Sequence, residues 1–239
     1  MQFYFIRHGQ SENNLLFLTT GASEGRSDDP ELTDVGRKQA EVLAQFLCCA
    51  APKSSANQFD EQNLAGFGLT HLYTSLMVRA VDTATVVARA LNLPLVAWED
   101  LHETGGIYQQ DEQTGERAGR PGKNRAYFEE HFPGLTMPIS LGETGWWDRP
   151  FEEREQRPAR AERVVRELLA RHGGTEDHVA VISHGGFYNV LLRSIFRIER
   201  EDCWFGLNNV AITRIDYSAD GVALTYTNRV DFLPRDLVT

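Results

Sequence analysis

The sequence is poor in cysteine, has no excess of basic residues and contains no long apolar run. Its 239 residues include three cysteines, the adjacent Cys48 and Cys49 and the distant Cys203. They cannot form the disulfide framework of a small secreted domain, and no Cys-x-x-Cys metal motif occurs. No stretch approaches the roughly 18 consecutive apolar residues of a membrane-spanning helix. The first residues also lack the basic leader and cleavage site of a signal peptide. We therefore expect a protein of the reducing cytoplasm in which Cys48 and Cys49 are buried and inert.

The net charge is negative, because 34 acidic residues outnumber 24 basic residues and give a formal charge of −10. A field of this sign repels the phosphates of nucleic acids and of anionic membranes, so neither is an expected partner. A small phosphorylated ligand is not excluded, because it responds chiefly to the charges of its own pocket, within a Debye length of roughly 8 Å. The sequence favours no particular oligomeric state.

Short apolar runs alternate with amphipathic stretches along the chain. The predicted strands are residues 3–6, 69–74, 95–98 and 178–182, followed by a hairpin of 210–217 and 222–227. The predicted helices are 34–47, with Thr33 as its N-cap, and 76–91, 160–172 and 185–196. Residues 10–30 are rich in Ser, Asn, Gly and Asp and are predicted to be loop. This alternation predicts an α/β fold, a three-layer sandwich with a central, mostly parallel sheet and helices on both faces.

Residues 104–157 break this alternation, because they mix Gly, Pro, Arg, Glu and aromatic residues without a clear period. A structureless loop of that length is uncommon inside a compact domain. We expect an inserted, cap-like subdomain that lies over the carboxyl edge of the sheet, where α/β proteins bind ligands. Within it, Trp146 and Trp147 are expected to pack the insertion onto its domain. The whole chain, 1–239, is predicted to form a single domain, with a smaller surface insertion at 51–68.

Polar residues follow four of the predicted strands. One strand ends at Arg7-His8-Gly9, and another at Ser183-His184-Gly185-Gly186. A third leads to Arg79 and a fourth to Glu103. Because the carboxyl ends of parallel strands meet at one edge of a sheet, we expect two histidines, two arginines and a carboxylate to share one cleft.

These residue types together suit phosphoryl transfer. The planar forks of Arg7 and Arg79 match a tetrahedral oxyanion. Among such cations a histidine is favoured in its neutral form, which leaves a ring nitrogen free as a nucleophile. Gly9 and Gly185 let the backbone approach a ligand, and the N–H groups that follow favour an anion. Glu103 offers a proton to a departing alkoxide. No metal and no cofactor is needed.

Four sequence blocks, in order, carry a resemblance to a known family. They are Arg7-His8-Gly9-Gln10-Ser11-Glu12-x-Asn14, Leu32-Thr33-x-x-Gly36-x-x-Gln39-Ala40, Tyr73-Thr74-Ser75 to Arg79, and Ser183-His184-Gly185-Gly186. Together they resemble the histidine phosphatase superfamily, also called phosphoglycerate mutase-like. The resemblance covers most of the chain outside 50–68 and the insertion.

The resemblance implies a role for each matching residue. It implies that His8 becomes the phosphohistidine and that Glu103 is the proton donor. The residues that would hold the phosphorylated substrate are Arg7, Arg79 and His184, with Asn14, Thr20, Gly21 and Gly185. The implied partner is a small phosphorylated substrate.

The segment after Glu103 departs from the phosphoglycerate mutase pattern. Those mutases follow the acidic residue with Arg-His-Tyr-Gly, whereas here Thr104-Gly105-Gly106-Ile107-Tyr108 follows. Lys123 and Asn124 stand in the reverse of the mutase order. We therefore predict a phosphatase, with mutase-type phosphoryl transfer as the alternative. Four basic residues of the insertion are candidates for contact with a second anionic group of the substrate: Arg117, Arg120, Lys123 and Arg125.

Two other classes of protein are weighed against this prediction. A metal hydrolase would need His-x-His or His-Glu-x-x-His spacing, which is absent, and the two arginines would repel its cation. A non-catalytic phosphate-binding module usually lacks the nucleophile or the clamp, and here both are present. Three further histidines lie in or beside regular elements without chemical context: His71, His172 and His178.

Overall fold

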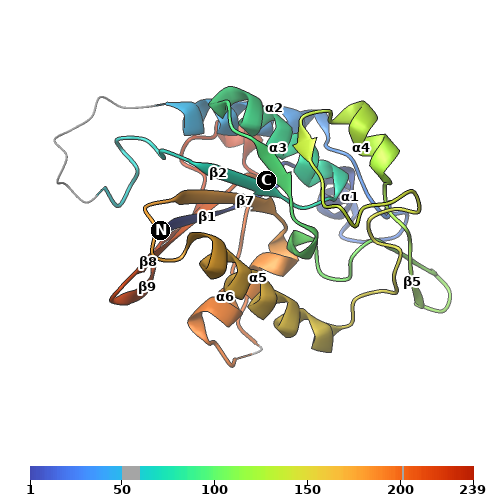
Figure 1. Ribbon diagram of the computed structural model, residues 1–239. Coiled ribbons are helices and arrows are strands. Elements are labelled where there is room, and N and C mark those ends of the chain that lie inside the picture. Colours follow the sequence, from blue (N-terminus) through green and yellow to red (C-terminus); the bar gives the residue numbers. More distant parts are fainter. Residues whose placement is uncertain (50–59, 201) are drawn as a thin grey trace.

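The computed structural model describes residues 1–49, 60–200 and 202–239, and in these residues a seven-stranded sheet lies between two layers of helices (Figure 1). In spatial order the strands are β6 (Leu135–Thr136), β3 (Leu95–Ala97), β2 (His71–Thr74), β7 (His178–Ser183), β1 (Gln2–Arg7), β8 (Ile212–Ser218) and β9 (Gly221–Arg229). The pairs from β6 to β1 are parallel, and the β1–β8 and β8–β9 pairs are antiparallel. The predicted α/β sandwich with a mostly parallel sheet is confirmed.

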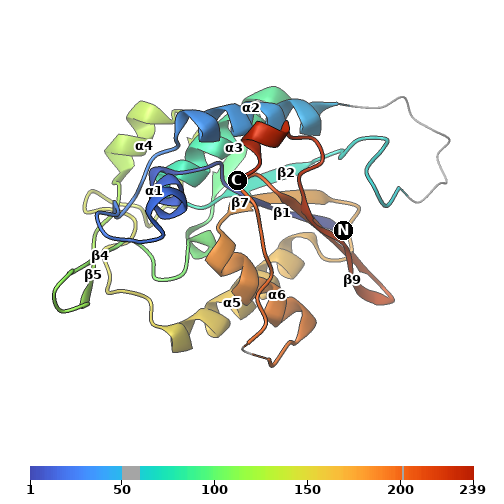
Figure 2. The same cartoon turned by 180° about the vertical axis from the view of Figure 1, so that it is seen from behind.

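Helices cover both faces of the sheet, as both views show (Figures 1 and 2). One layer holds α2 (Asp34–Cys48) and α3 (Val78–Leu91), and the other holds α5 (Arg157–His172) and α6 (Gly185–Phe196). Successive side chains of a strand point to opposite faces. Tyr4 and Ile6 of β1 therefore join the core under α2 and α3, and Phe3 and Phe5 join the core under α5 and α6.

The predicted element boundaries hold within a few residues, with one clear error. Thr33 caps α2 as predicted, since its hydroxyl accepts the Gly36 N–H at 3.0 Å. Residues 10–30 are not all loop, because α1 spans Glu12–Thr20. A capping box between Ser11 and Asn14 starts this helix, and none of its side chains is buried. Because this helix buries no apolar face, its sequence lacks the apolar periodicity of an amphipathic helix. The capping box marks its first turn instead.

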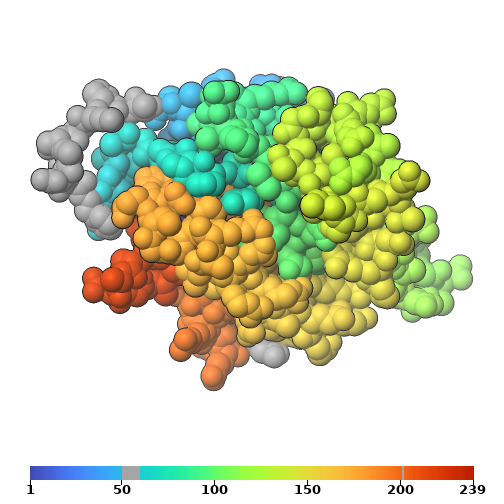
Figure 3. Space-filling model, in the orientation of Figure 1, coloured from blue at the N-terminus to red at the C-terminus, as the bar shows by residue number. Residues whose placement is uncertain are grey.

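The segment 104–157 contains short elements of its own. They are the β4–β5 ribbon (Tyr108–Gln110 and Arg117–Gly119), α4 (Arg125–His131), and β6, which pairs with β3 at the sheet edge. Three short 3₁₀ helices complete the described elements: η1 (Glu99–Leu101), η2 (Arg154–Gln156) and η3 (Arg235–Leu237). The segment lies at the same end of the sheet as α1 and forms a continuous surface there (Figures 1, 2 and 3). Trp146 and Trp147 are buried against His102, which confirms their packing role.

Two smaller sequence predictions need comment. Cys48 and Cys49 are exposed rather than buried, because the apolar face of α2 is completed by Leu43, Ala44 and Leu47 and ends before them. Of the surface insertion predicted at 51–68, residues 51–59 lie outside the described residues and 60–68 are described. None of the helices in the described ranges has the length and apolar character needed to cross a membrane.

Candidate active site

The carboxyl ends of three adjacent strands bring the predicted residues together. Beyond β1 and β7, the His8 N–H donates to Ser183 O at 3.0 Å, and the Ser75 N–H after β2 donates to Ile182 O at 3.1 Å. The parallel ladder thus continues past the strand ends. It places the imidazoles of His8 and His184 with their ring centroids 5.0 Å apart.

The buried His8 ring has one nitrogen held and one directed into the site. His8 Nδ1 lies 2.6 Å from the carbonyl oxygen of Gly9, which only accepts, so Nδ1 carries the proton. His8 Nε2 then has a free lone pair, and it accepts the Nε–H of Arg79 at 3.2 Å. Burial holds the pKa of His8 well below its usual value, and the charges of Arg79 and Arg7 lower it further. The ring is neutral, with its nucleophilic nitrogen facing a guanidinium.

Unpartnered donors surround this nitrogen. Ser75 Oγ accepts the Met77 N–H at 3.2 Å and lies 2.9 Å from His184 Nε2, and we assign the hydrogen of this second contact to the Ser75 hydroxyl. His184 Nδ1 is then a donor, and burial followed by the charge of Arg79 lowers the pKa of this ring. Three of the buried atoms without a hydrogen-bond partner belong to the predicted site residues: Arg7 Nε, His184 Nδ1 and Arg79 Nη1, the last of which lies 3.6 Å from Asp29 Oδ1. Buried donors without partners are rare, and here they suit the oxygens of a phosphoryl group.

A backbone carbonyl holds the guanidinium of Arg7, which remains charged. Its Nη1 donates to the carbonyl of Leu207 at 2.6 Å. Burial lowers the pKa of Arg7 to about 10, with Glu103 acting against this and Arg79 adding to it. Arg7 is therefore a cation at neutral pH, and the guanidinium of Arg79 likewise stays protonated, as arginine does in proteins.

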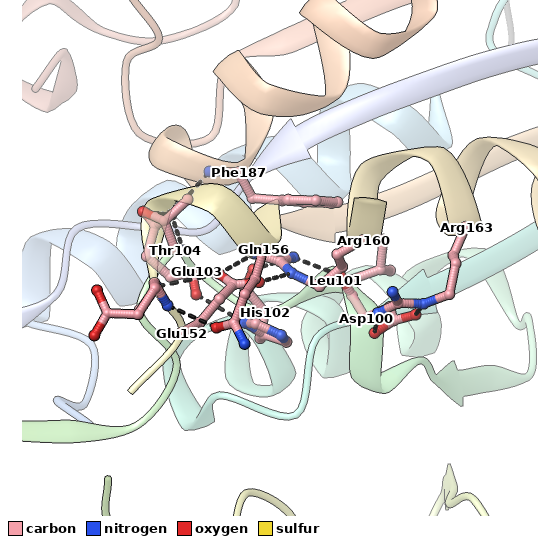
Figure 4. A network of polar contacts seen from close by, with 12 residues as sticks. Asp100, Leu101, His102, Glu103, Thr104, Glu152, Gln156, Arg160, Arg163 and Phe187 are labelled. Carbon is pink, nitrogen blue, oxygen red and sulfur yellow. Dashed lines mark hydrogen bonds and ion pairs between the residues drawn. The ribbon is translucent and has the colours of Figure 1, made fainter. Parts of the chain in front are cut away.

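Glu103 lies against the amino terminus of α6 (Figure 4). Its Oε1 accepts the Phe187 N–H at 2.8 Å and the Thr104 N–H at 2.7 Å, and its Oε2 accepts the Gly186 N–H at 3.0 Å. Helix N-terminal amides attract oxygen acceptors and anions, but the group that they bind here is the protein's own side chain, the carboxyl group of Glu103.

The close fit between Gly186 and Glu103 gives a sharp test. A Cβ at Gly186 would lie 2.4 Å from Glu103 Oε1, whereas a Cβ at Gly185 would have only ordinary contacts, the nearest at 3.6 Å from Arg7 Nε. We expect Gly186→Ala to displace the carboxylate and to slow hydrolysis of alkyl phosphates by about 100-fold. Kinetics with alkyl phosphates and thermal unfolding check this, with Gly134→Ala, at an open surface position, as the control. A Gly186→Ala protein with full activity would contradict it.

Gly9 serves packing rather than ligand approach, contrary to the sequence-based expectation. A Cβ at Gly9 would lie 2.5 Å from Gly36 O in α2, and a Cβ at Gly36 would lie 2.1 Å from Gln10 O. The two glycines let the His8 loop touch the first turn of α2. A buried hydrogen bond from Gln10 N–H to Gln39 Oε1, at 2.7 Å, fixes the same contact.

The predicted residues of α1 do not all reach the cleft. Asn14 Oδ1 accepts Asn209 Nδ2 at 3.1 Å, and that same amide donates to His8 O at 3.0 Å. Asn14 thus supports the His8 loop through Asn209. Thr20 and Gly21 are exposed at the far end of α1, about 9 Å along the helix from Asn14. The Thr20 hydroxyl donates to Leu16 O at 2.7 Å, within its own helix.

Asp29 is a functional candidate that sequence reasoning missed. Its side chain is 4% exposed, its Oδ1 accepts the Val78 N–H at 3.1 Å, and Oδ1 lies 3.6 Å from Arg79 Nη1. Burial raises the pKa of Asp29 to about 7, although Arg79 opposes this shift. Asp29 therefore pairs with the guanidinium that contacts His8, and this pairing fixes the position of the guanidinium. A single acidic residue in the Ser-Asp-Asp-Pro segment gives no sequence pattern, so its contact with Arg79 could be found only in the three-dimensional structure.

A cavity of about 510 Å³ opens beside this pair. Asp29 lies on its wall, and Arg120 and Lys123 of the insertion line it too. The other two basic residues predicted as substrate contacts, Arg117 and Arg125, contact other residues of the insertion. Arg125 donates to the carbonyls of Leu141 and Pro138, both at 2.8 Å, and Arg117 lies over the ring of Phe151.

A buried ion pair supports the segment that carries Glu103 (Figure 4). Arg160 of α5 makes two hydrogen bonds to the carboxylate of Glu152, at 2.5 and 2.8 Å. Its Nη1 donates to the carbonyls of Asp100 and His102, at 2.7 and 3.0 Å. Glu152 in turn accepts the Gly105 N–H at 3.3 Å. Arg160 therefore ties both sides of Glu103 to the domain.

Comparison with known proteins agrees with this geometry. Residues 3–230 match the histidine phosphatase superfamily (branch 1). A probable phosphoglycerate mutase, GpmB, of Yersinia pestis is 31% identical over 103 residues, which cover 43% of this chain and 38% of that protein. The chain thus aligns with well under half of the length of that relative.

Solved structures agree on the fold. A mycobacterial glucosyl-3-phosphoglycerate phosphatase superposes with a TM-score of 0.59 at 20% identity, over 96% of this chain and 99% of that one. A phosphoserine phosphatase of Entamoeba histolytica gives a TM-score of 0.57 at 21% identity, over 98% and 99%. The chain belongs to the histidine phosphatase superfamily. This membership supports the predicted enzyme class, a histidine-type phosphatase or a phosphoglycerate mutase-like enzyme.

Proposed function

We propose that the protein is a phosphatase that hydrolyses a small phosphomonoester through a phosphohistidine on His8, without a catalytic metal or a cofactor. The observation that carries this proposal is the unprotonated Nε2 of a buried, neutral His8, in contact with Arg79 Nε at 3.2 Å. Unpartnered donors of Arg7, Arg79 and His184 lie in the same site, which suits the equatorial oxygens of a phosphoryl group.

Two displacements complete the proposed reaction. In the first, the Nε2 lone pair of His8 attacks phosphorus, the P–O ester bond breaks, and the departing alkoxide takes a proton from Glu103. In the second, a water molecule attacks the phosphohistidine while Glu103 takes its proton, and the N–P bond breaks. Inorganic phosphate leaves, and both residues return to their first protonation states. The organic part of the substrate would lie in the cavity beside Asp29, whose wall carries Arg120 and Lys123 together with the carboxylates of Glu12, Asp28 and Glu31.

The role of Glu103 predicts a dependence on the leaving group. We expect Glu103→Gln to slow alkyl phosphates by about 100-fold or more, because a poor leaving group needs the proton. Activated aryl phosphates should slow much less. Steady-state rates for a series of esters of different leaving-group pKa check this, and equal slowing across the series would assign the proton to another group.

Mutase-type phosphoryl transfer is the second candidate, favoured by the partial match to the GpmB protein. A panel of phosphorylated metabolites, with 3-phosphoglycerate assayed for both hydrolysis and isomerisation, separates the two. We expect release of inorganic phosphate, and activity that survives excess chelator. Isomerisation as the main product would establish the mutase, and loss of activity with chelator would indicate a metal hydrolase. A protein that turns over no ester and takes up no phosphate at His8 would be a binding module.

The proposal also covers the domain organisation, the cellular compartment and the remaining substrate contacts. We treat residues 1–239 as one domain, with 104–157 inserted over the cleft. The three unpaired cysteines suit a reducing compartment such as the cytoplasm. Asn14, Thr20, Gly21 and Gly185 remain proposed substrate contacts, with Thr20 and Gly21 dependent on a movement of α1 toward the cleft.

A further inference from the structure

A second cluster of chemically active side chains lies at the opposite end of the sheet from His8. It consists of His71 at the start of β2, His172 at the end of α5, and Asp177 just before β7. One potential ligand atom from each residue lies within 4.8 Å of the others. Because β7 is six residues long, the cluster and the catalytic cleft are about 20 Å apart. The proposed phosphatase reaction makes no use of these residues.

The three side chains converge closely. His172 Nδ1 is 2.8 Å from one carboxylate oxygen of Asp177, and His71 Nδ1 is 4.0 Å from the other. The ring centroids of the two histidines are 4.5 Å apart. Sequence reasoning found no chemical context for these histidines, because they are far apart along the chain and meet only where the end of α5 lies beside the start of β2.

Neighbouring hydroxyls orient both rings. Tyr73 Oη lies 3.0 Å from His172 Nε2. Thr70 Oγ1 lies 2.9 Å from His71 Nδ1, the nitrogen that also faces Asp177, so a metal ion bound at Nδ1 would replace this contact. Metal-binding histidines usually bond an outer partner through the second ring nitrogen, which fixes the tautomer and the ring plane. Tyr73 is such a partner for His172, because its oxygen can accept the Nε2 proton when Nδ1 is a ligand.

We propose that His71, His172 and Asp177 bind one divalent transition-metal ion, with Zn²⁺ as the expected occupant. Two imidazoles and a carboxylate form a ligand set typical of Zn²⁺, and a water molecule would complete four-coordination. Tetrahedral bonds of about 2.0–2.1 Å place ligand atoms about 3.3 Å apart, so side-chain shifts of roughly 1 Å suffice. His172 is buried, whereas the side chains of His71 and Asp177 are 42% and 28% exposed, so the site is open to an ion from solution.

Such an ion would join β2, α5 and the turn before β7. Because binding favours the folded state, we expect Zn²⁺ at about 100 times its dissociation constant to raise the midpoint of thermal unfolding by roughly 5 °C or more. Titration calorimetry should give one site per chain, and Co²⁺ should give the visible absorption of a tetrahedral complex. Phosphatase activity should not require the ion.

Four variants test the assignment. His71→Ala and Asp177→Asn, both at partly exposed positions, should lose the Zn²⁺-dependent shift and the Co²⁺ absorption while keeping their activity. His131→Ala, at an exposed position of α4, should keep both signals. A His8→Ala protein should also keep them, which separates this site from the catalytic cleft and from the proposed function. Absence of binding, or a signal that survives His71→Ala and Asp177→Asn or disappears with His8→Ala, would overturn the proposal.

Discussion

His8→Ala is expected to reduce phosphatase turnover by about 10⁴-fold or more. No other group in the described site combines an unprotonated nitrogen with contact to a guanidinium, since His8 Nε2 accepts from Arg79 Nε and Nδ1 is held by Gly9 O. Removing a covalent nucleophile typically costs several orders of magnitude, and the remaining donors supply only the residual catalysis. Steady-state turnover of an activated aryl phosphate measures the loss, because the leaving group of that ester has little need of a proton from Glu103.

Two further measurements make the His8 result specific. Quenched reactions with radiolabelled substrate should show one acid-labile phosphate per chain in the parent protein and none in His8→Ala. The change in melting temperature should be modest, because the His8 side chain makes two hydrogen bonds, one to the carbonyl of its neighbour Gly9 and one from Arg79 Nε. His131→Ala, which removes an exposed imidazole, is the matched control and should keep full activity. Label that persists in His8→Ala would move the nucleophile to another residue, such as His184.

The catalytic cluster was predictable because it depends on a simple rule of topology. Arg7, His8 and His184 end strands whose apolar runs are clear in the sequence, and parallel strands end at one edge. Arg79 and Glu103 follow the neighbouring strands, so the same rule places them. Short motifs and strand ends are local signals, so the sequence could predict that these residues lie at one edge of the sheet.

The supporting residues were not predictable, because their partners are distant in sequence. The role of Asp29 depends on its contact with Arg79, and the role of Asn209 depends on its hydrogen bond to His8 O. The same holds for His71 and His172, which meet where the end of α5 lies beside the start of β2. Charged residues such as Arg160 usually lie at the surface, so a buried arginine contradicts the expectation from its residue type. Packing of the whole chain, rather than any periodicity, determines these contacts.

Arg160→Ala is expected to cause the largest loss of stability among the variants considered. Arg160 is 2% exposed, and its removal leaves the carboxylate of Glu152 buried without its cation. It also leaves the carbonyls of Asp100 and His102 without their donor. Breaking a buried pair by removing one partner typically costs about 3–5 kcal/mol. For a chain of this length that corresponds to a fall of roughly 10 °C in the midpoint of thermal unfolding.

The same helix provides a matched comparison. Arg163 lies one turn further along α5 and pairs with Asp100 at 3.1 Å, but its side chain is 49% exposed (Figure 4). An exposed pair contributes about 0–1 kcal/mol, so Arg163→Ala should change the midpoint only slightly. Equal losses of stability in Arg160→Ala and Arg163→Ala would show that burial does not determine how much the Arg160–Glu152 pair contributes to stability.

A double replacement separates the energetic role of the pair from its role in positioning Glu103. Arg160→Met with Glu152→Leu removes both charges and keeps apolar volume, so it should recover much of the stability lost in Arg160→Ala. The carbonyl of His102, the residue before Glu103, would still lack the guanidinium that fixes it. We therefore expect the double variant to fold well and to hydrolyse alkyl phosphates about 10-fold more slowly, with activated aryl phosphates little affected. Recovery of both stability and alkyl phosphate activity would mean that Arg160 supports the fold alone and that Glu103 is positioned by the α6 amides without its help.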